Sequence, residues 1–205
     1  MAGMSYPEGK FFDYLLALNA SRLADFNHWL FHPAMLFQAP RQWWGRGQRR
    51  PRPHEGLDIC WYRTRDGQRR ALPLEAVIPA PFAGRIVQIS PDFLGQSIFI
   101  RHPDVLPDGS SLLTALGHTR PRPGLAAGSW LSEGEGIATL AAPVGRPARV
   151  APHLHLTVAI LAPGPPPEPF QWETLGHPGA LTLLDPLTVF PTSFALTTAA
   201  GTEGP

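Results

Sequence analysis

Glycine and proline interrupt this chain throughout, with 20 glycines and 25 prolines among 205 residues. Proline lacks a backbone donor and glycine weakens regular elements, so neither suits the interior of a long helix. This composition therefore favours many short strands and turns. A hydrophobic content of 43% is that of a globular chain. The length suits one well-buried domain with an appendage, or two very small domains.

A β pattern extends from residue 54 to residue 160. Short alternating or apolar runs between turn residues predict strands over 57–62, 85–90, 97–102, 112–118 and 150–161. Asp66-Gly67 and Asp108-Gly109 predict tight turns. We therefore expect a mainly β fold, built as an antiparallel sheet or a barrel-like sandwich, with a further packed segment over 181–190.

The two ends of the chain depart from this pattern. Apolar residues recur every three to four positions over 8–38, which predicts an amphipathic helix or helix pair in an N-terminal helical extension over 1–39. Residues 40–53 form a basic, tryptophan-containing linker, which is either a connector packed on the domain or a surface for an anionic polymer. The β-rich domain is expected over 54–192 and a disordered tail over 193–205.

Composition excludes several functions. The net charge of +1 gives no case for a nucleic-acid partner. Lys10 is the only lysine, which argues against Schiff-base or phosphate-loop lysine chemistry, and Cys60 is the only cysteine, so no intrachain disulfide can form. Neither a signal peptide nor an 18-residue apolar segment is apparent, so we expect no transmembrane helix and leave the location open between cytosol and cell envelope.

Histidine and aspartate are concentrated at three places in the β region. An H-x-x-x-D pair opens it, a single histidine ends a central strand, and an H-x-H pair lies on the last strand, where alternate residues share a face. Catalytic zinc has three protein ligands, and hydrolysis also needs a base and an oxyanion donor. The five residues that could divide in this way are His54, Asp58, His118, His153 and His155.

Other candidates give weaker alternatives. Cys60 would share a strand face with Asp58, and as a fourth ligand it would close the site and make it structural. His28 and His32 are four residues apart, which on a helix would place both on one face. Without a third ligand nearby they are interpreted as packing or surface residues.

The order H-x-x-x-D, single His, H-x-H resembles the lysostaphin-type (LytM-like) zinc endopeptidases, which cut peptidoglycan peptides. The resemblance covers roughly residues 50–160 and includes the segment Gly128–Ile137 and the sequence Pro-His-Leu-His-Leu over 152–156. It implies an antiparallel β core with a groove that ends at one zinc ion. His54, Asp58 and His155 would then be the zinc ligands. His118 and His153 would activate water and stabilise the oxyanion, in an order that the resemblance leaves open.

Some positions depart from the family pattern. Leu116, Thr119 and Thr157 replace residues that the family usually has beside its histidines. These changes affect groove shape and substrate preference, and Arg146 and Arg149 could favour an acidic substrate. The expected partner is a peptidoglycan peptide. The alternatives are a non-catalytic binding or regulatory module on the same fold, and a cytosolic metallopeptidase with another substrate.

Overall fold

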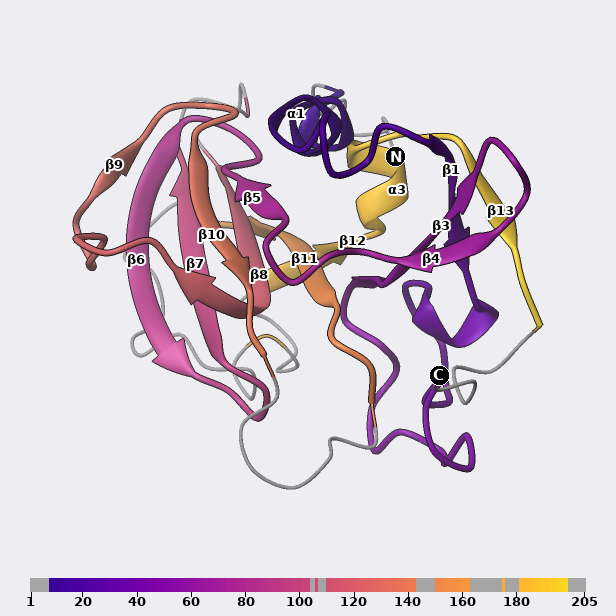
Figure 1. Ribbon diagram of the computed structural model, residues 1–205. Coiled ribbons are helices and arrows are strands. Elements are labelled where there is room, and N and C mark those ends of the chain that lie inside the picture. Colours follow the sequence, from indigo (N-terminus) through magenta and orange to yellow (C-terminus); the bar gives the residue numbers. More distant parts are fainter. Residues whose placement is uncertain are drawn as a thin grey trace.

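The computed structural model describes residues 8–103, 106, 110–142, 150–162, 175 and 181–198. The predicted turn at Asp108-Gly109 and the two loop arginines, Arg146 and Arg149, lie outside these ranges. The fold is mainly β, as predicted, with a short helix near the N-terminus (Figure 1).

The described elements follow one another as α1 (Phe11–Leu18), β1 (Phe26–Phe31), η1 (Pro33–Met35), β2 (Leu57–Ile59), β3 (Trp61–Thr64), β4 (Arg69–Ala71), β5 (Val77–Pro79), β6 (Gly84–Pro91), β7 (Gln96–His102), β8 (Ser111–Pro121), β9 (Trp130–Leu131), β10 (Gly136–Leu140), β11 (Leu154–Leu161), β12 (Leu181–Leu184), α3 (Pro186–Val189) and β13 (Phe194–Leu196).

A large antiparallel sheet carries most of these strands. Its order is β12-β11-β8-β7-β6-β9, with β2 paired to β11, and with β10 paired to both β8 and β5. β8 and β11 lie side by side at its centre (Figure 1). Both are buried along most of their length, because their apolar side chains face the core on one side and a smaller cluster around Phe99 on the other.

A second sheet has the order β13-β1-β3-β4, and it lies on the other side of the molecule in Figure 1. The β3–β4 hairpin turns at the predicted Asp66-Gly67, where Gly67 adopts a positive φ of 88°. One continuous hydrophobic core joins the two sheets and includes Trp29, Leu57 and Leu156. No helix among the described residues is long and apolar enough to cross a membrane.

The helical prediction for residues 8–38 is correct only for α1. The helix ends at Leu18, where Asn19 forms the C-cap. The Asn19 side chain donates to the carbonyls of Leu15 and Val77 and accepts from the Val77 amide, which ties the end of the helix to β5. Residues 26–31 form strand β1 instead, where aromatic residues suit a sheet and pairing with β3 and β13 is available. Consequently His28 and His32 do not share a helical face.

The segment predicted as a linker, 40–53, and part of the segment predicted as a disordered tail both have regular contacts with the domain. In residues 40–53, Arg41 pairs with Arg49 across a small turn and Trp43 is buried, which agrees with the connector packed on the domain. Phe194–Leu196 forms β13, which pairs in parallel with β1 and stacks Phe194 on Phe31. The expectation of a disordered tail from residue 193 is therefore wrong for this strand.

Candidate metal centre and active site

Three paired strands position the predicted site residues. β2 lies antiparallel to β11, with Asp58 directly opposite His155, and β11 pairs with β8, with His155 opposite Gly117. His118 follows on β8. Gly56 precedes β2, and a side chain there would meet the Leu156 carbonyl at 2.4 Å. Gly56 thus permits the close approach of β11.

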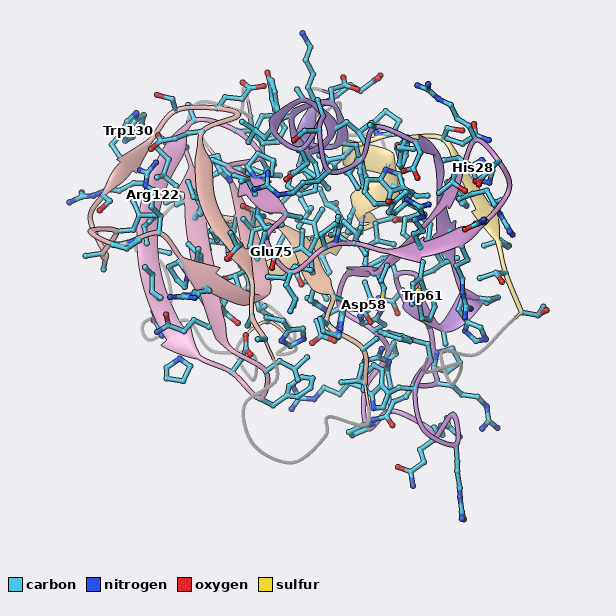
Figure 2. The ribbon with its side chains drawn as sticks, viewed as in Figure 1. His28, Asp58, Trp61, Glu75, Arg122 and Trp130 are labelled. Carbon is cyan, nitrogen blue, oxygen red and sulfur yellow. The ribbon has the colours of Figure 1, made fainter. Side chains whose placement is uncertain are left out.

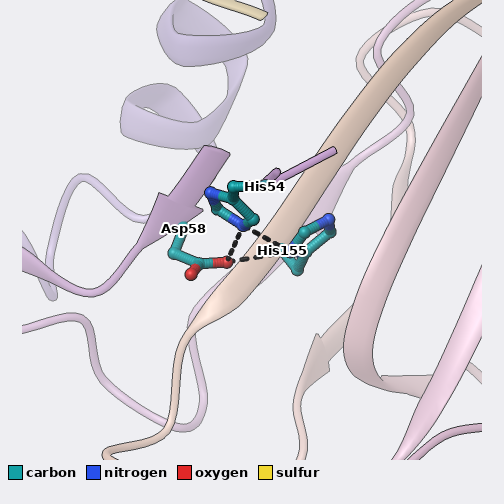
Figure 3. Close-up of side chains that lie close together, drawn as sticks. All are labelled: His54, Asp58 and His155. Carbon is teal, nitrogen blue, oxygen red and sulfur yellow. Dashed lines mark hydrogen bonds and ion pairs between the residues drawn. The ribbon is translucent and has the colours of Figure 1, made fainter. Parts of the chain in front are cut away.

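His54, Asp58 and His155 form a buried cluster whose candidate ligand atoms all lie within 4.8 Å of one another. His54 Nε2 lies 3.2 Å from Asp58 Oδ1, His155 Nδ1 lies 2.8 Å from the same oxygen, and the two ring nitrogens are 3.3 Å apart (Figure 3). The structure thus brings together the three residues that the family resemblance singled out, which are separated by as many as 101 positions.

The outer contacts of these rings suit a metal ion at the centre. His54 Nδ1 lies 3.0 Å from the Leu36 carbonyl, which can only accept, so Nδ1 carries a hydrogen and Nε2 of the neutral ring offers a lone pair. That lone pair faces the Asp58 carboxylate, so two hydrogen-bond acceptors lie in contact. A cation between them would remove their mutual repulsion. His155 Nε2 can donate to Thr157 Oγ1 at 2.9 Å and so leave Nδ1 as a ligand atom. The donor set and its tautomers therefore fit zinc.

Two residues from the 40–53 segment hold the other oxygen of Asp58. Trp43 Nε1 donates to Asp58 Oδ2 at 2.7 Å, and Arg50 Nη2 lies 3.4 Å from the same atom. Oδ1 is thereby left to face the histidines. This role was not predicted, because a tryptophan in a basic stretch also fits a connector packed on the domain or a surface for an anionic polymer.

Asp92 orients His118 in a way that the sequence analysis missed. Its Oδ1 lies 3.1 Å from His118 Nδ1, and its Oδ2 accepts from the His118 amide at 2.8 Å and from the Ser97 hydroxyl at 2.6 Å. His118 has a positive φ of 63°, which is uncommon for a histidine. The buried carboxylate thus fixes both an unusual backbone conformation and the ring. Nothing in the sequence singles out Asp92, since it lies 26 positions away in a loop.

His153 completes the group from the segment just before β11. Its Nδ1 lies 2.8 Å from the Ala151 carbonyl, so this nitrogen donates and Nε2 is an acceptor in the neutral ring. Nε2 lies 3.6 Å from Asp58 Oδ1, and the ring centroids of His153 and His118 are 4.7 Å apart.

Burial and the neighbouring side chains together shift the pKa values of these groups. Burial lowers the pKa of His153 to about 4, despite the nearby Asp58 carboxylate, and lowers the pKa of His155 as well. Burial alone would raise the pKa of Asp58, but His54, His153 and His155 outweigh it and hold that pKa well below its usual value. An ionised Asp58 beside a neutral His155 is the protonation state that a metal ion needs in these two ligands.

A pocket of about 310 Å³ opens onto the cluster. Its lining contains four of the five predicted site residues, while His54 lies beneath them with no exposed surface. The lining residues are Trp44, Arg50, Glu55, Asp58, Phe93, His118, His153 and His155. Phe93 is 67% exposed and packs on the His118 ring, with centroids 4.6 Å apart.

The remaining candidates lie apart from the cluster. Cys60 is buried, its thiol faces the Pro152 carbonyl at 3.4 Å, and burial raises its pKa well above the usual value, which disfavours a thiolate ligand there. His28 is on β1, at the edge of the molecule distant from Asp58 in Figure 2. His32 caps η1 by accepting from the Ala34 amide.

The chain resembles several solved structures in its fold, but its sequence gives no match. No family model and no curated protein matches the chain. Lysostaphin and M23 catalytic domains are among the solved structures that it resembles. The lysostaphin catalytic domain from Staphylococcus simulans has a TM-score of 0.44 and 16% identity, over 82% of this chain and 95% of that one. The M23 protein EnpA from Enterococcus faecalis has a TM-score of 0.37 and 19% identity, over 66% and 86%.

The SpoIIQ–SpoIIIAH pore-forming complex also matches, with a TM-score of 0.44 and 14% identity over 91% of this chain and 92% of that one. All three likenesses are distant. The case for a function therefore comes from the residues of the site.

Proposed function

We propose that this protein is a zinc-dependent endopeptidase that hydrolyses peptide bonds of peptidoglycan, in cross-links or stem peptides. The observation that carries the proposal is the convergence of His54, Asp58 and His155 beneath a pocket that two further histidines also line. The sequence resemblance to lysostaphin-type peptidases supplies the substrate class.

His54, Asp58 and His155 would hold the metal through Nε2, Oδ1 and Nδ1. A bound zinc ion supplies Lewis acidity, which polarises the scissile carbonyl and makes a water molecule acidic near neutral pH. Trp43 and Arg50 keep Asp58 Oδ1 turned towards the two histidines.

In this proposal the two other histidines act as a general base and as a hydrogen-bond donor to the oxyanion. His153 presents Nε2 as an acceptor, because its Nδ1 donates to Ala151, so it takes the proton from the attacking water. His118 is paired with the Asp92 carboxylate, which stabilises an imidazolium, so His118 Nε2 donates to the developing oxyanion. A carbon–oxygen bond forms, the carbon–nitrogen bond breaks, and the amine leaves with the proton held by His153.

The test is His118→Ala and His153→Ala in separate variants. Each should lose at least about 100-fold in kcat on a peptidoglycan peptide, because each removes a group that acts in the transition state. Zinc content per chain, measured by mass spectrometry, should stay at the wild-type value. Wild-type rates in either variant would show that the proposed roles are wrong.

A further inference from the structure

Arg50 brings a cation to the wall of the pocket. It belongs to the segment 40–53, its side chain is only 13% exposed, and it lines the pocket together with the Asp58 carboxylate and the histidines. Among the described residues that line this pocket, it is the only lysine or arginine. A cation so enclosed must be offset by acceptors or by an anion.

Three contacts fix the guanidinium in place. Arg50 Nε donates to the Arg41 carbonyl at 3.2 Å, the group stacks over the Trp44 ring with 5.0 Å to its centroid, and Nη2 lies 3.4 Å from Asp58 Oδ2. Arginine loses little entropy on binding when its planar group is already held, so this placement is that of a preorganised binding group.

The pairing with Asp58 does not use the whole guanidinium. Asp58 Oδ2 already accepts the shorter bond from Trp43, at 2.7 Å compared with 3.4 Å from Arg50. A guanidinium has five N–H donors, and these contacts engage two of them. The guanidinium can therefore donate hydrogen bonds to a second carboxylate that enters the pocket.

The charge of the pocket favours such a ligand. Asp58 and Glu55 contribute two negative charges, Arg50 with a divalent ion would contribute three positive charges, and the His118 imidazolium is offset by Asp92, which leaves one net positive charge. A neutral peptide would leave this charge without a partner, whereas a carboxylate would balance it.

We propose that Arg50 binds a free carboxylate of the substrate beside the scissile peptide bond. The substrate class is then a peptide with an anionic residue next to that bond, such as the α-carboxylate left free by a γ-linked acidic residue. This inference rests on the proposed peptidase function. It predicts faster cleavage of such anionic peptides than of peptides that are neutral around the cleaved bond.

The experiment compares two peptidoglycan peptides that differ only by carboxylate or carboxamide beside the cleaved bond. The wild-type protein should prefer the carboxylate in kcat/KM by about 10-fold to 100-fold, as for a hydrogen bond to a charged group. Arg50→Gln should bring the ratio near one, mainly by slowing the carboxylate peptide. Because both peptides meet the same enzyme preparation, any loss of zinc in the variant cancels in the ratio.

Arg46→Gln is the matched control, because Arg46 belongs to the same segment but lines a different pocket with Trp44. Its preference should equal that of the wild type. Equal cleavage of both peptides by the wild type, or an unchanged preference in Arg50→Gln, would overturn the role of Arg50 and leave the peptidase function standing. Cleavage of neither peptide would instead overturn the proposed function.

Discussion

At the scale of single residues, Asp92 is the group on which the proposed role of His118 depends. The carboxylate is buried, and bonds from His118 and Ser97 outweigh the effect of burial and hold its pKa below the usual value. Asp92→Asn keeps an acceptor for His118 Nδ1 but removes the charge that stabilises the imidazolium. We expect kcat to fall by about 100-fold, as when one oxyanion donor is lost, with zinc affinity unchanged.

Asp185→Asn is a suitable control for Asp92→Asn, because Asp185 accepts from the Leu187 amide and caps α3. It should leave kcat at the wild-type value. A wild-type kcat in Asp92→Asn would mean that the charge of Asp92 does not act on catalysis through His118.

At the scale of elements, the segment 40–53 supports the candidate metal centre, because Trp43 donates to the candidate ligand Asp58. Trp43→Phe keeps an aromatic ring in the core but deletes the hydrogen bond to Asp58. Outer partners of ligands typically contribute 10-fold to 100-fold to metal affinity, so zinc binding should weaken by about that factor in a competition titration against a chromophoric chelator.

Trp61→Phe tests the effect of packing alone, since Trp61 packs edge to face on Trp43 with centroids 5.1 Å apart and has no hydrogen bond to Asp58 among the described contacts. This variant should bind zinc as the wild type does. If the two variants weaken zinc binding equally, the hydrogen bond is not the cause.

The sequence predicted those elements that carry their own local signal. Alternation and turn residues were sufficient for the Asp66-Gly67 turn and for β6, β7, β8 and β11. The single strand predicted over 57–62 is instead divided between β2 and β3, which lie in different sheets. The family resemblance, and not the spacing of the histidines alone, selected the candidate ligands. β1 was missed because its apolar spacing also fits a helix and its sheet partners, β3 and β13, lie elsewhere in the chain. Trp43, Arg50 and Asp92 were missed because their function arises only from tertiary contacts.

At the scale of the whole molecule, His102, a buried histidine outside the candidate site, links stability to pH. His102 bonds to the Ala83 carbonyl and to Thr114, and burial lowers its pKa to about 4 from an ordinary value of 6.5. Between these values the unfolded chain takes up a proton that the folded protein does not, so stability falls as pH falls from about 6.5 to 4. The loss from this one group is about 3 kcal/mol.

Urea unfolding at several pH values tests this link. In His102→Gln the free energy of unfolding should depend less steeply on pH over that window, whereas His28→Gln, a partly exposed control on β1, should keep the wild-type slope. An unchanged slope in His102→Gln would contradict the assignment. Burial also lowers the pKa values of His153 and His155, but these two residues contribute equally in all three proteins and do not affect the comparison.

We propose that the buried His-Asp-His cluster makes this protein a metal-dependent peptidase of the cell wall. The most direct measurement is mass spectrometry of muropeptides after digestion by the zinc-replete protein, with and without a chelator. We predict peptides cut at one type of bond, loss of these products with the chelator, and their return when zinc is added back. No muropeptide product from zinc-replete protein, or products that the chelator does not affect, would contradict the account.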